Sequence, residues 1–178
     1  MARRLHIVAA PRPDGVSRTR QVAAAFLDAY RQANPSDKIE TLDLFAAPLP
    51  EMDAVGVEAK FKNARGEEME GAVRQRWNEI DHFVEQFLAA DKYVFTAPMW
   101  NFGIPYRLKH YFDVIVQARR TFRYVSGKSE GLAAGCPAVL LTSRGGIYSP
   151  GSPGEAMNQQ EPYLGTIQIG RASCRERV

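Results

Sequence analysis

Four short apolar segments, separated by longer segments with helical spacing, constrain the fold of this chain more than any other feature. The apolar segments predict strands at residues 5–10, 38–45, 92–97 and 138–142. Apolar side chains recur every three or four residues over 17–34, 67–90 and 106–119, and residues 154–168 resemble the start of another helix. This alternation predicts an α/β domain with a parallel sheet.

Two features refine this prediction. The first, third and fourth apolar segments do not alternate with polar residues, which favours burial on both faces of the sheet. Residues 46–65 contain prolines without a clear period, and residues 121–137 contain several glycines, so both stretches are expected to be irregular. In a sheet of this kind ligands bind beyond the carboxyl ends of the strands, so any site should lie in the loops that follow them.

Composition excludes several classes of protein. The 178 residues are 45% hydrophobic and 24% charged, which is typical of a globular domain and not of a disordered chain or a coiled coil. No apolar run approaches the roughly 20 residues of a membrane-spanning helix, and we expect no membrane partner. Two cysteines form no disulfide framework or zinc motif, which favours a reducing, cytoplasmic location. The net charge of +3 is too small to indicate a nucleic-acid partner.

The last ten residues, 169–178, differ in character from the rest. They read IGRASCRERV, a codon-for-codon translation of a sequencing-library adapter, so we expect a non-native tail after a domain at residues 1–168. The tail carries three arginines and one glutamate, which account for two of the three net positive charges.

Three loops at the predicted carboxyl edge could bind a ligand. The first enters a helix through Ser17, Arg18 and Thr19, where hydroxyls and free backbone N–H groups suit a phosphate. The second has an aromatic and amide character suited to a flat ring with polar edges; its residues are Met99, Trp100, Asn101 and Phe102. The third lets the backbone approach a ligand closely; its residues are Ser143, Arg144, Gly145 and Gly146.

Each loop taken alone is also compatible with a capped helix, a hydrophobic contact or a tight turn. Together they describe a mononucleotide site, and flavin mononucleotide (FMN) fits better than a nucleotide that needs magnesium. The glycine pattern of dinucleotide-binding loops is absent. His6, His82 and His110 lack metal-ligand spacing and are expected to be structural, so we predict neither a metal site nor a catalytic side chain.

Three motifs resemble one known family. APMWNFGIPYRLKHYF at 97–112, TFRY at 121–124 and TSRGGI at 142–147 are similar to FMN-dependent NADH azoreductases, also described as NADH:quinone oxidoreductases. The resemblance implies a flavodoxin-like three-layer sandwich with strand order 2-1-3-4, and a fifth strand that we expect to be missing here. The chain departs from the family pattern at Ala10-Pro11, where the family commonly has a serine, and at Trp100, where the family commonly has a tyrosine.

The same resemblance implies a function. FMN would be held near a homodimer interface, with phosphate contacts from Ser17, Arg18 and Thr19 and flavin contacts from the other two loops. Tyr124 and Phe122 would line the substrate side. NADH would donate electrons by a ping-pong mechanism to quinones and azo compounds. A non-catalytic flavodoxin-type electron carrier and an inactive fragment remain alternatives; the former is often strongly acidic, unlike this chain.

Overall fold

The computed structural model describes residues 1–133 and 135–170, so the expected tail lies outside the described residues from position 171 onward. A four-stranded parallel sheet forms its centre, in the order β2-β1-β3-β6. The strands are β1 (Arg3–Val8), β2 (Lys38–Asp43), β3 (Lys92–Pro98) and β6 (Ala138–Ser143). The predicted strands and their order 2-1-3-4 are therefore confirmed, with β6 as the fourth strand of this sheet.

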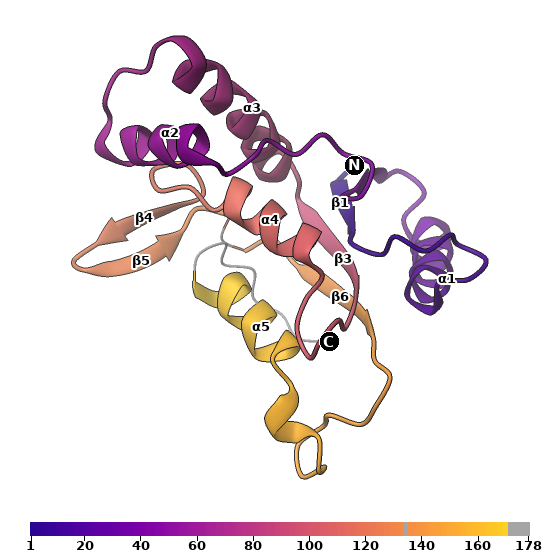
Figure 1. Ribbon diagram of the computed structural model, residues 1–178. Coiled ribbons are helices and arrows are strands. Elements are labelled where there is room, and N and C mark those ends of the chain that lie inside the picture. The colour runs from indigo at the N-terminus through magenta and orange to yellow at the C-terminus, as the bar shows by residue number, and fades with distance from the viewer. Residues whose placement is uncertain (134, 171–178) are drawn as a thin grey trace.

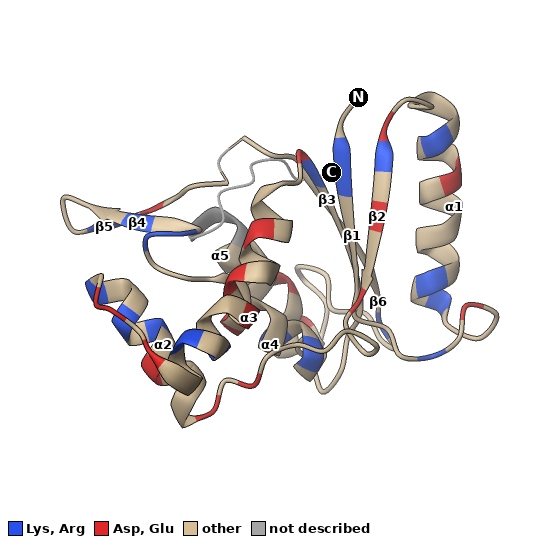
Figure 2. Ribbon diagram, turned by 90° about the horizontal axis from the view of Figure 1, so that it is seen from above, with Lys and Arg blue, Asp and Glu red and all other residues tan. Residues whose placement is uncertain are grey.

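Helices cover both faces of the sheet. Helix α1 (Arg18–Ala33) lies on one face, and α3 (Gly71–Leu88), α4 (Tyr106–Ile115) and α5 (Gln160–Gly170) lie on the other (Figure 1; Figure 2). The main hydrophobic core lies on this second side, where alternate residues of β1 and β3 pack against α3 and α4. These three layers match the predicted sandwich.

Burial differs between the strands. Nearly all residues of β1 and β3 are buried, because each has a strand on both sides and helices above and below. Only Ala138 of β6 is fully buried, so the prediction of a fourth strand buried on both faces was wrong. Among the described residues β6 lies at the edge of the sheet, which explains its partial exposure.

Helix α2 (Ala54–Arg65) occupies part of the stretch that we expected to be irregular. Asp53 caps its start by accepting from the Gly56 amide at 2.9 Å, and Gly66 ends it with φ +74°. Its pattern was hidden because Val57 and Phe61 face solvent and only Gly56 and Ala59 are buried. A helix with so little buried surface leaves almost no period in the sequence.

Two predicted helices are shorter than expected. The chain enters α3 through Gly71 at φ +52°, a left-handed conformation that cannot continue a helix back to residue 67. Helix α4 ends at Ile115 because the buried Gln117 side chain donates to the carbonyls of Asp113 and Val114 at 2.9 and 2.8 Å. These hydrogen bonds take carbonyls that a longer helix would use.

The other expected irregular stretch contains a hairpin of β4 (Phe122–Val125) and β5 (Lys128–Gly131). Its two-residue turn, Ser126-Gly127, has positive φ at both positions, 50° and 78°, as a type I′ turn requires. Near the C-terminus, a 3-10 turn η1 (Glu155–Met157) precedes α5, so the helix starts later than predicted.

Candidate functional site

The first loop ends in helix α1, which Ser17 caps. Ser17 is buried, and its side-chain oxygen accepts from the Arg20 amide at 3.3 Å. The amides of Arg18 and Thr19 precede the helix's own hydrogen-bond pattern, so they point out of its N-terminus together with the positive end of the helix dipole. Arg18 itself is exposed at this end. The loop therefore offers both backbone donors and a cation to an anion.

The loop after β3 is a tight turn that projects two of the predicted residues. Trp100 and Gly103 exchange hydrogen bonds, N to O at 3.1 Å and 2.9 Å. Asn101 and Phe102 stand between them at φ 47° and 67°. Left-handed backbone is costly for Phe, and such strain is concentrated at functional sites. Asn101 is exposed, as are Trp100 and Phe102, so their side chains are accessible to a ligand.

In the loop after β6, the Arg144 side chain is held by contacts, while open space adjoins Gly145. Arg144 is directed toward the start of α5, where it donates to Gln160 at 3.3 Å and pairs with Glu161 at 3.2 Å. A Cβ placed on Gly145 would meet no atom within 4 Å, whereas one on Gly146 would lie 3.1 Å from the Tyr148 hydroxyl. Space for a ligand therefore adjoins Gly145, and the Arg144 guanidinium is already engaged.

Direct contacts join the three loops at the carboxyl edge of the sheet. Thr19 Oγ1 lies 2.6 Å from Ser143 Oγ, which connects the first and third loops. The Met99 amide donates to the Ser143 carbonyl at 2.8 Å, which connects the second and third. The Phe102 carbonyl accepts from Gln159 at 3.0 Å. The structure thus brings together the three loops that carry the eleven residues predicted for the cofactor.

The two residues predicted on the substrate side lie elsewhere in the chain. Helix α4 leads away from the Trp100 turn, and the hairpin with Phe122 and Tyr124 follows its far end (Figure 1). Phe122 is buried in the core, whereas Tyr124 is 65% exposed. Within one chain, therefore, neither residue joins the three loops.

Sequence reasoning missed several side chains near this edge. The rings of Phe45, Trp100 and Tyr106 form a cluster with centroids 5.7 to 6.5 Å apart. Arg107 supports it by donating to the carbonyls of Leu44 and Ala47, each at 2.6 Å. Tyr106 lies inside the quoted motif at 97–112 and could have been noticed, but Phe45 lies on a distant segment that only the fold brings close.

Each of the three histidines has a structural contact, and that of His82 is an edge contact with the Phe83 ring at 5.4 Å. His6 Nε2 lies 2.8 Å from Thr96 Oγ1 inside the sheet, and burial, aided by Arg20 and Arg31, lowers the pKa of His6 from 6.5 to about 4. His110 donates to the Pro50 carbonyl at 2.8 Å. In the part of the chain that is described, no group of three or more His, Cys, Asp or Glu residues could hold a metal ion.

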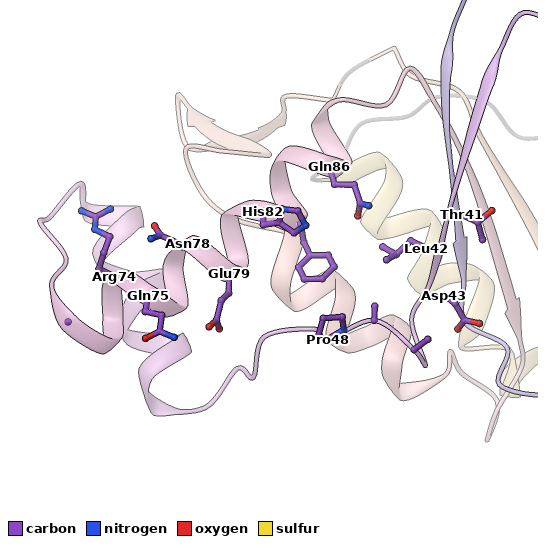
Figure 3. A pocket seen from close by; sticks show the side chains of 14 residues that line it. Thr41, Leu42, Asp43, Pro48, Arg74, Gln75, Asn78, Glu79, His82 and Gln86 are labelled. Atoms are coloured by element: carbon purple, nitrogen blue, oxygen red, sulfur yellow. The ribbon is translucent and has the colours of Figure 1, made fainter.

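An open concavity of about 970 Å³ lies beside the sheet, between the end of β2 and the outer face of α3. Figure 3 shows Asn78, Glu79 and His82 along the helix, with Asp43 and Pro48 across from them. No residue predicted for the cofactor or the substrate lines it. No helix within residues 1–133 and 135–170 is long and apolar enough to cross a membrane.

Comparison with known proteins places these observations in context. A family model described as flavodoxin-like fold matches residues 2–168. An FMN-dependent NADH:quinone oxidoreductase of Nitratidesulfovibrio vulgaris strain DP4 is 42% identical over 164 residues, covering 92% of this chain and 78% of that protein. The FMN-dependent NADH:quinone oxidoreductase 2 of Listeria innocua is 44% identical over 170 residues, covering 94% and 80%.

Two solved azoreductase structures are also similar to this chain. An azoreductase from Bacillus anthracis strain Sterne superposes with a TM-score of 0.90 at 30% identity, covering 98% of this chain and 84% of that one. An FMN-dependent NADH-azoreductase from Bacillus anthracis strain Ames Ancestor, solved in complex with FMN, gives 0.86 at 29% identity, covering 96% and 82%.

Proposed function

We infer the function of this chain from its family, because it belongs to the FMN-dependent NADH:quinone oxidoreductases of flavodoxin-like fold. It is an oxidoreductase that uses FMN and NADH to reduce quinones and azo compounds. Within the structure, the single observation that supports this conclusion is the meeting of the three loops at one edge of the sheet.

The phosphate end of FMN fits the start of α1. An anion there would meet the outward amides of the first helical turn and the positive end of the dipole. Arg18 is exposed beside them and can pair with a phosphate oxygen. The hydroxyls of Ser17 and Thr19 are buried and hold the loop in shape, and each keeps a lone pair or a proton for the ligand.

The ring end fits the other two loops. The space beside Gly145 lets backbone N–H groups approach a ring edge without a side chain between them. Asn101 can both donate to and accept from ring heteroatoms, and Met99, Trp100 and Phe102 supply apolar surface for the ring. Arg144 contributes by fixing the Ser143–Gly146 loop to α5, while Gly146 contributes through its backbone.

Bound FMN supplies the chemistry, accepting a hydride from NADH and passing two electrons to a quinone or azo acceptor. The three loops would bind and orient the cofactor, and NADH and the acceptor would react at it in turn, with ping-pong kinetics. We assign no catalytic side chain, because no general base is needed to take a hydride. Residues 1–168 form the FMN-binding domain in this proposal.

A homodimer completes the proposed site. Tyr124 is exposed on a hairpin that follows the far end of α4, so it would line the substrate side of a second copy's flavin rather than its own. Phe122, buried at the base of the hairpin, holds Tyr124 in place through an edge contact at 5.5 Å. We also propose a cytoplasmic location, since the described Cys136 is a free thiol.

Flavin content and turnover test the proposed function together. The purified chain is reconstituted with FMN, its visible absorbance is recorded, and NADH-dependent reduction of a benzoquinone is followed. We expect yellow protein that oxidises about one equivalent of NADH per flavin without the acceptor and turns over only when the acceptor is present. A stable semiquinone without NADH turnover would instead indicate an electron carrier. Well-folded protein that does not bind FMN would contradict the proposal.

A further inference from the structure

One arginine in the first turn of α1 contacts three separate parts of the chain around the β1–α1 loop. Arg20 Nε donates to the Ala10 carbonyl, just after β1, at 2.7 Å. Its Nη1 donates to Asp14 within the loop at 3.2 Å, and its Nη2 donates to Asp43 at the end of β2 at 2.5 Å. A single side chain therefore ties the start and the middle of the loop to the neighbouring strand.

The partners of Arg20 are themselves held in place. Asp43 accepts from the Phe45 amide at 3.0 Å through its other carboxylate oxygen, which fixes its orientation. The Arg20 amide donates to Ser17 Oγ, the cap of α1. The Arg20 side chain is only 19% exposed, in contrast to the 82% of Asp14. The Arg20–Asp43 pair is thus the more rigid part of the contact, and the loop attaches to it.

The loop needs this support, because residues 11–16 are all exposed and few other contacts restrain them. The Pro13 carbonyl accepts from Val16 and Ser17 at 3.0 and 2.9 Å, and Gln21 donates to the Gly15 carbonyl at 3.2 Å. Ordering a flexible loop upon binding reduces affinity, since the entropy of each fixed residue is lost at that moment. A loop held in shape beforehand avoids that loss.

We propose that Arg20 is a positioning residue for the cofactor phosphate, acting through Ala10, Asp14 and Asp43 rather than by touching the ligand. It holds the β1–α1 loop in the shape that receives the phosphate and neutralises Asp43, whose carboxylate would otherwise repel the ligand. Three of its five N–H donors are already used within the protein. This inference rests on the proposed FMN-dependent function.

The test compares FMN with riboflavin, which carries the same ring without the phosphate. The full chain without flavin is titrated with each ligand, and quenching of flavin fluorescence gives the dissociation constants. Arg20→Ala should weaken FMN binding about tenfold, equivalent to about 1.4 kcal/mol, and change riboflavin binding less than about twofold. Arg20→Lys keeps the charge but not the forked geometry, and should show an intermediate loss for FMN.

Arg31→Ala is the matched control, because Arg31 lies on the same helix. Among the ion pairs described, Arg31 pairs only with Asp28. This variant should bind both flavins as the parent protein does. If Arg20→Ala does not fold by circular dichroism, Arg20→Lys decides the question. If the ratio of the FMN dissociation constant to the riboflavin dissociation constant were the same in the parent and in both Arg20 variants, the inference would be overturned. Failure of the parent protein to bind either flavin would overturn the proposed function as well.

Discussion

Gly145 allows a test in which the ligand site changes and the fold does not. A Cβ at Gly145 would meet nothing within 4 Å, and its backbone lies outside the left-handed region. Gly145→Val should therefore leave the melting temperature of the apoprotein within about 2 °C, since surface changes of this kind cost roughly 0.5 kcal/mol or less. Its affinity for FMN should fall at least tenfold, because the side chain fills space proposed for the ring.

Gly165→Val provides the control for that experiment. Gly165 also has open space at its Cβ, but it lies within α5 and away from the three loops. Thermal melting and flavin titration of both variants give the comparison. An unchanged FMN affinity in Gly145→Val would place the ring elsewhere.

The buried His6 makes the stability of the fold dependent on pH. Its pKa is lowered to about 4 in the folded protein, from 6.5 in an unfolded chain, chiefly because burial disfavours the charged ring. The unfolded state therefore binds more protons than the folded state between these values, and stability falls as the pH decreases through them. Between about pH 7 and pH 5 the free energy of unfolding should fall by about 2 kcal/mol.

Urea unfolding at both pH values measures this dependence. His6→Gln, which cannot titrate, should lose most of it, while His82→Gln on the exposed side of α3 should retain it. Carboxylates such as Asp37, whose pKa is lowered by hydrogen bonds from Tyr30, Ala2 and Lys92, contribute stability that is lost only at more acidic pH. An identical slope in the parent and His6→Gln would contradict this assignment.

At the scale of single elements, the Asn101-Phe102 turn stores backbone strain at the mouth of the site. Phe102 adopts φ 67°, which costs a residue with a Cβ about 1 kcal/mol or more relative to glycine. Phe102→Gly should therefore be more stable than Phe102→Ala by about 1 kcal/mol, the reverse of the usual order. Guanidinium unfolding of the two variants, with both lacking the ring, isolates the backbone contribution.

The matched comparison is at Phe61, an exposed residue inside α2. Phe61→Ala should be more stable than Phe61→Gly there, because glycine is unfavourable in a helix. If the alanine variant were also the more stable one at Phe102, as expected at Phe61, the turn would carry no such strain.

Element boundaries were less predictable than the elements themselves, for local physical reasons. Helix α3 begins four residues late because of the positive φ at Gly71, and α4 ends early because Gln117 caps it. The hairpin has only a short apolar alternation in β4 (FRYV) and none in the polar β5 (KSEG), although its Ser126-Gly127 turn is a recognisable signal. Backbone conformation and side-chain capping decided these ends, and hydrophobic spacing does not report either one.

At the scale of the whole molecule, the hairpin's distance from the three loops predicts complementation between two defective chains. In the proposed homodimer, Asn101→Ala should impair the flavin loop and Tyr124→Ala should impair the hairpin. Each variant by itself should therefore reduce quinone poorly. In a mixed dimer the intact hairpin of the first chain would serve the intact flavin loop of the second. Co-expressed and co-purified heterodimer should then recover up to half of the parent activity.

Tyr124→Ala should fold and be as stable as the parent protein, since the Tyr124 side chain is 65% exposed and few contacts would be lost. Equilibrium sedimentation provides the oligomeric state of each preparation. Absence of any recovery in the mixed dimer would mean that Tyr124 serves the flavin of its own chain or none.

The sequence by itself determined the α/β architecture with a parallel sheet and the three loops, because hydrophobic period and loop chemistry are local properties of the chain. The layered sandwich and the strand order followed from the resemblance to a known family. Candidate cofactor residues could be proposed since parallel strands bring their carboxyl ends to one edge. Only the tertiary structure decided the Thr19–Ser143 contact, the Arg20–Asp43 pair, the place of Phe45 beside Trp100 and the separation of Tyr124 from the loops. These depend on how segments distant in sequence pack, and no local pattern encodes that distance.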